Sequence, residues 1–430
     1  MVQPRPEVPP ALPGIIRHQV LANGLTLCRV ESRNAPVVTC ALFYRAGARD
    51  EEPGLGGTAH FLEHMMFKGS RNYGPGEIDR LTQALGGVNN AFTSHDLTAY
   101  YFDFAADRWT EALAIEVDRM ENLTLDPDEV ASERQVILEE ISMSASDPWD
   151  ALETEAMAAL FQPHPYGRPV LGTEADLLRI GRDELAAFHA RFYRPENAVL
   201  VIGGDVGPEA EAAARACFAP VAGGRGLVRM PPPAPAAPTE LVRVTRRQGE
   251  VPRLLLLRLA PHATHPSHPA LRLLVTVLGG GRASRLHRAL VDEGQICSWV
   301  SVDVAESLET GFLAVAAELV PGEDPARAEE VLFAELERLS ASGPSEEEVE
   351  RAKQIAVADW IFGHERVHQQ ALALGGALTL FDLRHPERQL GRLLAADQND
   401  LKRAAARWLD PGQGGVLGWS LPAEPAGRPS

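Results

Sequence analysis

The sequence is poor in lysine, with only three lysines among 41 basic residues, against 59 acidic residues. The resulting net charge of −18 argues against a nucleic-acid partner, because binding to a phosphate backbone needs clustered lysine and arginine. The sequence also lacks an apolar run of roughly 18 residues or more, so it predicts no membrane span. These absences leave the composition of a globular protein, with 45% hydrophobic residues.

Cysteine is scarce, and the N-terminus lacks an apolar stretch. The four cysteines lie far apart and form no CxxC pair, which favours buried free thiols over disulfides or a cysteine metal site. Residues 1–15 are rich in proline and lack the apolar core of a signal peptide. We therefore expect a flexible N-terminal arm and a cytoplasmic protein, or a periplasmic one if a leader has been removed.

Proline, glycine and alanine are concentrated in residues 220–239, which we expect to be an extended linker. This linker separates an N-terminal domain, residues 16–219, from a C-terminal domain, residues 240–430. Strand patterns and long helical patterns follow one another in a similar order in both domains. Without strict alternation of strands and helices, this order predicts an α+β fold with a structural repeat. One long alternating segment, residues 89–104, predicts a single strand.

The sequence His-Phe-Leu-Glu-His at residues 60–64 is the main chemical motif. On a helix, His60 and His64 lie one turn apart on the same face, where two neutral imidazoles can bind one zinc ion. Glu63 then projects beside the metal, where a general base belongs. This H-x-x-E-H order is the inverted zinc motif. The alternative is a surface helix with two solvated histidines.

A catalytic zinc site needs a third ligand, and residues 128–150 form a strong helical pattern that offers several acids. Glu133 and Glu140 lie seven residues apart, which puts them on one face two turns apart. Glu139 is rotated by about 100° from Glu140 and faces elsewhere. A carboxylate from this helix would complete a site of two histidines and one glutamate, and the alternative is a solvated acidic face.

Four segments occur in a recognisable order: GGTAHFLEHMMFKGS, NNAFTSHDLTAYYF, ERQVILEEI and YRPENAVLVIGGDV. Together they resemble the superfamily of insulinase, pitrilysin and the mitochondrial processing peptidase. Weaker similarity extends the resemblance to roughly residues 16–410, and the length resembles the small processing-peptidase-like subunits. The resemblance implies two structurally similar α/β-sandwich half-domains of the mitochondrial-processing-peptidase-like metallohydrolase type, the second of them non-catalytic.

The resemblance also implies roles for individual residues. His60, His64 and Glu140 match the ligands of one Zn²⁺ ion per chain, and Glu63 matches the catalytic glutamate. Glu133 matches the residue that orients a ligand.

Two further expectations concern the helix register and the substrate. Glu139 is the alternative ligand if the helix register differs. Asn90 and Ala91 match the edge strand to which the substrate backbone adds as a further β-strand, a mode that suits unfolded peptides.

One family feature is missing from the second half, which contains no tyrosine. Family members that work alone carry an Arg and a Tyr seven residues apart there, and the corresponding positions hold Val291 and Ser298. We therefore expect a zinc-bearing subunit of a heterodimer, whose homologous metal-free partner supplies the Arg/Tyr pair. A homodimer that dispenses with the pair is the alternative.

The resemblance implies a zinc metalloendopeptidase that cleaves unstructured peptides in an enclosed chamber. Glu63 would take a proton from water and pass it to the leaving amine. The alternatives are a self-sufficient homodimer, a protease that processes a precursor peptide (for example in pyrroloquinoline quinone biosynthesis) and a scaffolding subunit without activity.

Overall fold

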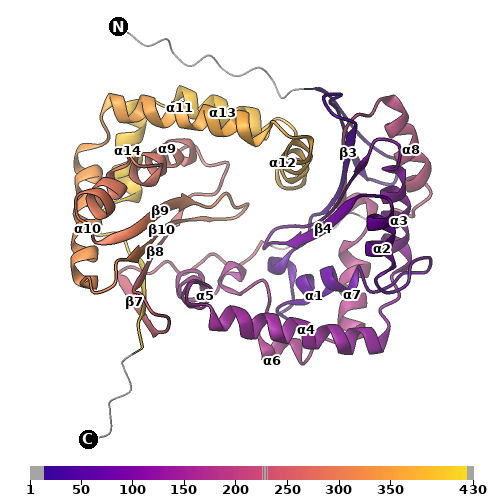
Figure 1. Cartoon of the computed structure of the whole chain (residues 1–430), viewed down its shortest axis with the longest axis horizontal. Helices are drawn as coiled ribbons and strands as arrows, with labels where there is room; N and C mark the ends of the chain where they lie inside the picture. Colours follow the sequence, from indigo (N-terminus) through magenta and orange to yellow (C-terminus); the bar gives the residue numbers. More distant parts are fainter. Residues whose placement is uncertain (1–13, 225, 227–228, 230, 424–430) are drawn as a thin grey trace, which may run out of the picture.

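The computed structural model describes residues 14–224, 226, 229 and 231–423, which form two mixed β-sheets with helices around them (Figure 1). We call residues 14–219 the first half and residues 240–423 the second half. Residues 1–13 of the expected arm lie outside the described ranges, and Ile15, assigned to that arm, already begins strand β1. The described residues of the expected linker contain no helix or strand.

The first sheet has six strands in the order β1-β2-β6-β3-β5-β4. The strands are β1 (Ile15–Val20), β2 (Thr26–Glu31), β3 (Val37–Tyr44), β4 (Val88–Thr93), β5 (Thr98–Ala105) and β6 (Ala198–Gly204). Strands β2 and β6 are parallel, and the other neighbours are antiparallel. β4 lies at one edge of the sheet.

The second sheet has five strands in the order β7-β11-β8-β10-β9. The strands are β7 (Leu241–Arg247), β8 (Arg253–Ala260), β9 (Cys297–Val304), β10 (Gly311–Leu319) and β11 (Gly415–Leu421). This sheet also has one parallel pair, β7 with β11, which corresponds to β2 with β6 in the first sheet. This order reproduces β2-β6-β3-β5-β4 strand for strand, so the predicted repeat and the α+β class are confirmed.

Helices cover both sheets (Figure 1). Those of the first half are α1 (Thr58–Met65), α2 (Glu77–Ala84), α3 (Thr110–Asn122), α4 (Pro127–Ser146), α5 (Pro148–Phe161), α6 (Glu174–Leu177), α7 (Arg182–Phe192) and α8 (Pro208–Phe218). Those of the second half are α9 (His268–Gly279), α10 (Pro325–Ser342), α11 (Glu346–Gly363), α12 (Val367–Leu380), α13 (His385–Ala395) and α14 (Gln398–Trp408). No helix in the described ranges has both the length and the apolar character needed to cross a bilayer.

Two helices are exchanged between the halves. Helix α12 belongs to the second half, but Ala371 and Leu374 on this helix are buried against Phe43 and Val201 of the first sheet. Helix α5 belongs to the first half and packs in return on β8 and β11 of the second sheet. Each sheet thus depends on a helix from the other half to cover one of its apolar faces.

The expected single strand at residues 89–104 is wrong, because the structure divides it into β4 and β5. A tight turn reverses the chain, and the backbone amide of Ser94 donates to the carbonyl of Leu97 at 2.8 Å. The hydroxyl of Ser94 donates to the same carbonyl at 3.1 Å. The alternating pattern continues through the turn without glycine or proline, so periodicity alone did not reveal the reversal.

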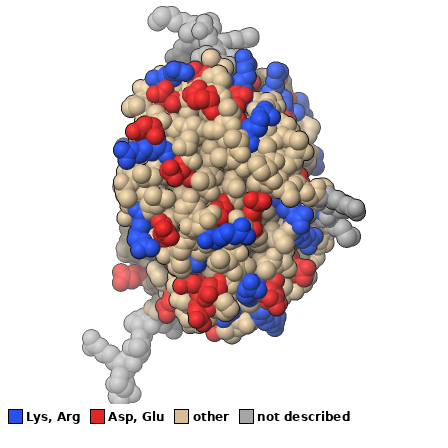
Figure 2. Space-filling view, turned by 90° about the vertical axis from the view of Figure 1, so that its right-hand side faces the viewer, with Lys and Arg blue, Asp and Glu red and all other residues tan. Residues whose placement is uncertain are grey.

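The four cysteines are free thiols, as the sequence predicted. Figure 2 views the molecule from the right-hand side of Figure 1, where α3 and α8 lie, and shows basic and acidic side chains interspersed among uncharged ones. Among the described residues on this face, no broad patch of basic charge is present that could follow a phosphate backbone.

Candidate metal centre

Helix α1 begins at a turn that a buried carboxylate stabilises. Gly57 has φ +92, the left-handed region that favours glycine, and a Cβ there would lie 2.6 Å from the carbonyl oxygen of Leu171. The carboxylate of Glu51 accepts hydrogen bonds from the backbone amides of Gly57 and Ala59, at 3.1 and 2.9 Å. These amides have no partner within the first turn of a helix, so Glu51 satisfies two of them and fixes the start of α1.

The amphipathic pattern of α1 then separates the core from the functional face. Phe61, Leu62 and Met65 are buried in the core of the first half. His60 and His64 lie on the other face of the helix, with side chains that are 14% and 17% exposed. The helix thus holds two imidazoles at the edge of the core, one turn apart, as the sequence predicted.

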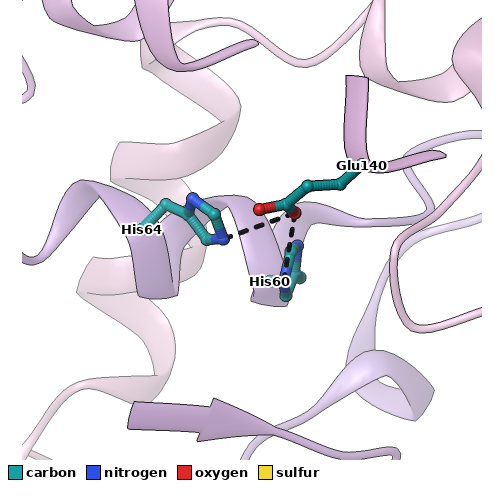
Figure 3. Close-up of side chains that lie close together, drawn as sticks. All are labelled: His60, His64 and Glu140. Atoms are coloured by element: carbon teal, nitrogen blue, oxygen red, sulfur yellow. Dashed lines mark ion pairs between the residues drawn. The ribbon is translucent and has the colours of Figure 1, made fainter. Parts of the chain in front are cut away.

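Helix α4 brings a carboxylate to these two imidazoles (Figure 3). The Nε2 atoms of His60 and His64 lie 4.0 and 3.7 Å from one carboxylate oxygen of Glu140. One candidate ligand atom from each of the three residues lies within 4.8 Å of the others. The side chain of Glu140 is 37% exposed, so the cluster is accessible from one side, as a catalytic metal site requires.

Glu133, two turns before Glu140, orients His64. Its carboxylate accepts a hydrogen bond from Nδ1 of His64 at 2.8 Å and forms an ion pair with Nζ of Lys68 at 2.6 Å. Burial alone would raise the pKa of Glu133, but the hydrogen bonds from His64 and Lys68 lower it. Because Nδ1 of His64 donates this hydrogen bond, Nε2 is the nitrogen left to bind a metal, and it lies 3.7 Å from Glu140.

Glu63 lies beside the cluster and contacts the edge strand. The hydroxyl of Thr93 donates a hydrogen bond to the Glu63 carboxylate, with 2.5 Å between the oxygens. Burial raises the pKa of Glu63, and the charge of Glu140 adds to this effect, whereas Thr93 and His64 oppose it. A carboxylate with an increased affinity for protons is suited to accept one from water.

The two histidines differ in protonation: His60 is ready to bind a metal, whereas a metal at His64 competes with a proton. Burial, together with the nearby His64, lowers the pKa of His60 to about 3, so this imidazole is neutral and has a free lone pair. Burial also opposes protonation of His64, but the hydrogen bond to Glu133 and the charges of Glu140 and Glu63 outweigh it and raise the pKa of His64. Two imidazoles and a carboxylate are a donor set found in catalytic zinc sites, so these residues fit the predicted metal.

The structure also shows which predicted residues lie elsewhere. Glu139 is exposed and does not belong to the cluster of three, whereas Glu140 does. Asn90 and Ala91 lie on β4, which pairs only with β5 among the described strands and packs beside α1. The predicted edge strand is thus an edge next to the candidate metal centre.

Two residues that the sequence analysis did not single out contribute to the centre. Lys68 lies in the turn that follows α1, where its backbone amide donates to the carbonyl of Met65 at 3.0 Å, and it is one of only three lysines in the sequence. Thr93 lies in β4, and its contact with Glu63 joins segments 30 residues apart. The contact between Thr93 and Glu63 depends on the fold, and no local signal in the sequence indicates it.

The positions expected for the absent Arg/Tyr pair lie in the second half. Val291 is in a π-helical turn, His287–Asp292, and packs partly buried against the second core. Ser298 lies on β9, where it is exposed and its hydroxyl donates to the carbonyl of Glu318 at 3.2 Å.

Comparison with known proteins places the chain in a family. Residues 28–174 match the family model described as insulinase (peptidase family M16), and residues 179–356 match the model described as the peptidase M16 inactive domain. An uncharacterized zinc protease of Mycobacterium tuberculosis is 31% identical over 407 residues, which are 90% of each chain. The chain belongs to peptidase family M16. The family and the two-part fold predicted from the sequence are therefore confirmed.

Further proteins are similar to this chain in sequence or in structure. The zinc protease PqqE of Helicobacter pylori is 28% identical over 351 residues, 79% of this chain and 78% of PqqE. The crystal structure of a protease from Helicobacter pylori has a TM-score of 0.88 and 25% identity, and the match covers 95% of this chain and all of that one. The periplasmic protease PqqL of Escherichia coli shares the fold, with a TM-score of 0.77 and 19% identity, over 94% of this chain and 47% of PqqL.

Proposed function

We propose that this family M16 protein is a zinc metalloendopeptidase in which His60, His64 and Glu140 bind one Zn²⁺ ion. The observation that carries the proposal is the convergence of three ligand atoms of the correct chemical types from two helices. Glu133 supports the site by holding His64 in the tautomer that a metal requires. The zinc protease names of relatives that match most of the chain point the same way.

Zinc at such a site supplies Lewis-acid chemistry toward a peptide carbonyl and a water molecule. Glu63 is the general base. Its carboxylate takes a proton from the attacking water as the oxygen bonds to the carbonyl carbon, and it later gives that proton to the amine that leaves when the C–N bond breaks. Thr93 holds this carboxylate from the β4 side, which fixes its position relative to a substrate on the same strand.

Strand β4 is the proposed substrate-binding edge. A peptide that lies beside Asn90 and Ala91 can pair with the open backbone edge of β4, and its scissile bond then passes near α1. Such pairing requires an extended backbone and recognises few side chains. The proposed substrates are therefore unstructured peptides.

We also propose that a second chain completes the active site. Val291 and Ser298 occupy the positions of the Arg/Tyr pair that self-sufficient relatives of the family are expected to use. A homologous, metal-free partner that carries the pair would close the chamber and hold the substrate backbone. The expected compartment is the cytoplasm, with the periplasm as the alternative.

The zinc proposal is tested with purified protein, metal analysis and a library of unstructured peptides. The protein should contain one zinc ion per chain and cleave the peptides. Glu63→Gln should retain zinc and lose activity by at least roughly 10²–10⁴-fold, because the amide cannot accept the proton. His60→Ala should lose both zinc and activity. Native activity in Glu63→Gln, or zinc that remains after His60→Ala, would contradict the assignment.

The partner proposal is tested in the same assay with two samples. One contains the zinc-loaded chain alone, and the other contains it with a sister chain that has the Arg/Tyr pair and lacks H-x-x-E-H. Cleavage only in the mixture supports the heterodimer. Full cleavage by the chain alone rules out an obligatory partner and supports the homodimer, while the zinc chemistry stands.

A further inference from the structure

A cavity of about 430 Å³ lies in the second half, among helices α9, α11, α12 and α13. Its size is within the range of sites that hold a small molecule. Apolar side chains from three of these helices line it, including Leu273, Leu380 and Leu393. In Figure 1 these helices lie on the upper side of the molecule, away from α1 and α4, so the cavity is separate from the candidate metal centre.

Three polar side chains that line this cavity, those of His364, His385 and Gln389, each have one atom without a hydrogen-bond partner among the described residues. His385 and Gln389 lie one turn apart on α13, and each is only 6% exposed. The amide nitrogen of Gln389 donates to the carbonyl of Ala263 at 2.6 Å, but its Oε1 atom has no partner among the described residues. The same holds for Nε2 of His385. Nε2 of His364 is a third such atom. Buried polar atoms are usually paired, so these three indicate a ligand that supplies hydrogen bonds.

Aromatic rings form another part of the lining. The rings of Phe381 and His385 are stacked, with centroids 3.9 Å apart and an interplanar angle of 14°. Trp360 and His364 form a second pair, with centroids 4.1 Å apart and an angle of 37°. All four rings line the cavity. Flat, polarisable surfaces of this kind favour a planar ligand.

The charged residues that line the cavity do not favour an anionic ligand. Arg272 and Glu306 form an ion pair at 2.5 Å on its exposed side and neutralise each other. Asp359, also exposed, leaves the charged lining with a net negative charge. Burial lowers the pKa of His385, so that imidazole is neutral. An uncharged ligand matches this environment best.

We propose that this cavity binds a small, uncharged aromatic molecule whose ring carries an N–H or O–H donor, as in an indole or a phenol. Oε1 of Gln389 accepts the donor hydrogen, and the rings of Phe381 and Trp360 contact the ligand's ring. The same chemistry occurs in free small molecules and in tryptophan or tyrosine side chains of peptides. The binding site is independent of the zinc proposal, because no residue of the metal centre lines it.

Helix α12 connects this cavity to the first half. Ala373, Gly376 and Leu380 line the cavity on one side of the helix. Ala371 and Leu374 on another side are buried against the first sheet. A ligand in the cavity therefore contacts the helix on which the packing between the two halves depends.

The test is calorimetric titration of the full chain, with and without zinc, using indole as the probe. We expect 1:1 binding with a dissociation constant on the order of 1 mM or tighter, equal in both metal states. Benzothiophene has a similar shape but no N–H group, so it should bind at least about tenfold more weakly. A second titration, with N-acetyl-tryptophanamide, identifies the source: tighter binding than indole assigns the site to peptides, and weaker binding assigns it to free small molecules.

Variants localise the site. No atom lies within 4 Å of the position of a Cβ on Gly376, so the helix has room for a side chain here. Gly376→Leu places that side chain in the cavity and should abolish binding. Gly391→Leu is the control, because this glycine is exposed on α13 with equally open surroundings and does not line the cavity. Thermal unfolding checks that both variants fold. Undetectable indole binding, equal affinity for benzothiophene, or unchanged binding in folded Gly376→Leu would each overturn the proposal.

Discussion

The hydroxyl of Thr93 donates a hydrogen bond to the carboxylate of Glu63, and this contact joins the edge strand to the helix that carries the candidate metal ligands. Strand β4 thereby takes part in both proposed steps, since it pairs with the peptide and positions the base. Substrate alignment and proton transfer are coupled through one side chain.

Thr93→Val should lower kcat while zinc content stays unchanged. Valine has nearly the same shape but cannot donate a hydrogen bond, so Glu63 loses its orientation. We expect a decrease of roughly 10–100-fold, the usual effect of removing a group that orients a catalytic residue. Thr93→Ser keeps the hydroxyl and serves as the control. Steady-state kinetics measures kcat, and metal analysis measures the zinc content. Equal kcat in the wild type and Thr93→Val would show that Thr93 does not orient Glu63.

Glu133→Ala should weaken zinc binding. The substitution removes the acceptor for Nδ1 of His64 and the partner of Lys68. Competition with a fluorescent chelator should show a dissociation constant that rises by roughly 10–100-fold. Glu139→Ala is the matched control, because this acid lies on the same helix but is exposed. Similar affinities in the two variants would remove Glu133 from the site.

Two adjacent glycines on α12 should respond in opposite ways to alanine. A Cβ on Gly375 would lie 2.0 Å from a ring atom of Phe43, so Gly375→Ala pushes α12 away from the first sheet. We expect a loss of roughly 1–3 kcal/mol in the free energy of unfolding. A Cβ on Gly376 meets no atom within 4 Å, so Gly376→Ala should gain roughly 0.5–1 kcal/mol through its helix propensity. Urea unfolding tests both, and an equal effect would contradict the tight packing of α12 on Phe43.

Glu51 should make stability depend on pH. Burial raises its pKa from the ordinary value of 4.5 to about 8, although the amides of Ala59 and Gly57 oppose this shift. Between these two values the folded state binds a proton that the unfolded state has lost, so the stability of the wild type falls as pH rises from about 4.5 to about 8.

Glu51→Gln cannot ionise and lacks this contribution. Its free energy of unfolding relative to the wild type should therefore increase from pH 5 to pH 8, by at most about 4 kcal/mol. Urea unfolding at several pH values gives the difference directly. A difference that stays constant across this range would show that Glu51 is ionised in the folded protein throughout.

Much of the candidate site could be predicted from the sequence because its determinants are local. The spacing of His60 and His64 depends on one helix, and so does the choice of Glu140 over Glu139. Two such helices, together with the family resemblance, were sufficient to place the three candidate ligands. Thr93 could not be predicted in the same way, because its partner is brought to it by the path of the chain through the first sheet.

The same distinction between local and long-range determinants applies to the fold. Strands and helices of both halves follow from hydrophobic patterns, and their common order predicted the repeat. Helix α12 contacts the first sheet through Ala371 and Leu374, and its own sequence does not say which sheet these residues cover. Residues 89–104 failed for a different reason. The Ser94–Leu97 turn is local, but the alternating pattern continues through it, so the pattern did not show where the strand ends.

The exchange of α5 and α12 determines the order in which the protein can be completed during synthesis. The last strand of the first sheet, β6, ends at Gly204, but α12 ends at Leu380, about 175 residues later. At the usual elongation rates of roughly 5–20 residues per second, α12 is synthesised roughly 9–35 s after β6. Phe43 and Val201 lack their contacts with α12 until then. During that time one apolar face of the first sheet has no helix over it, which is the kind of surface that chaperones bind.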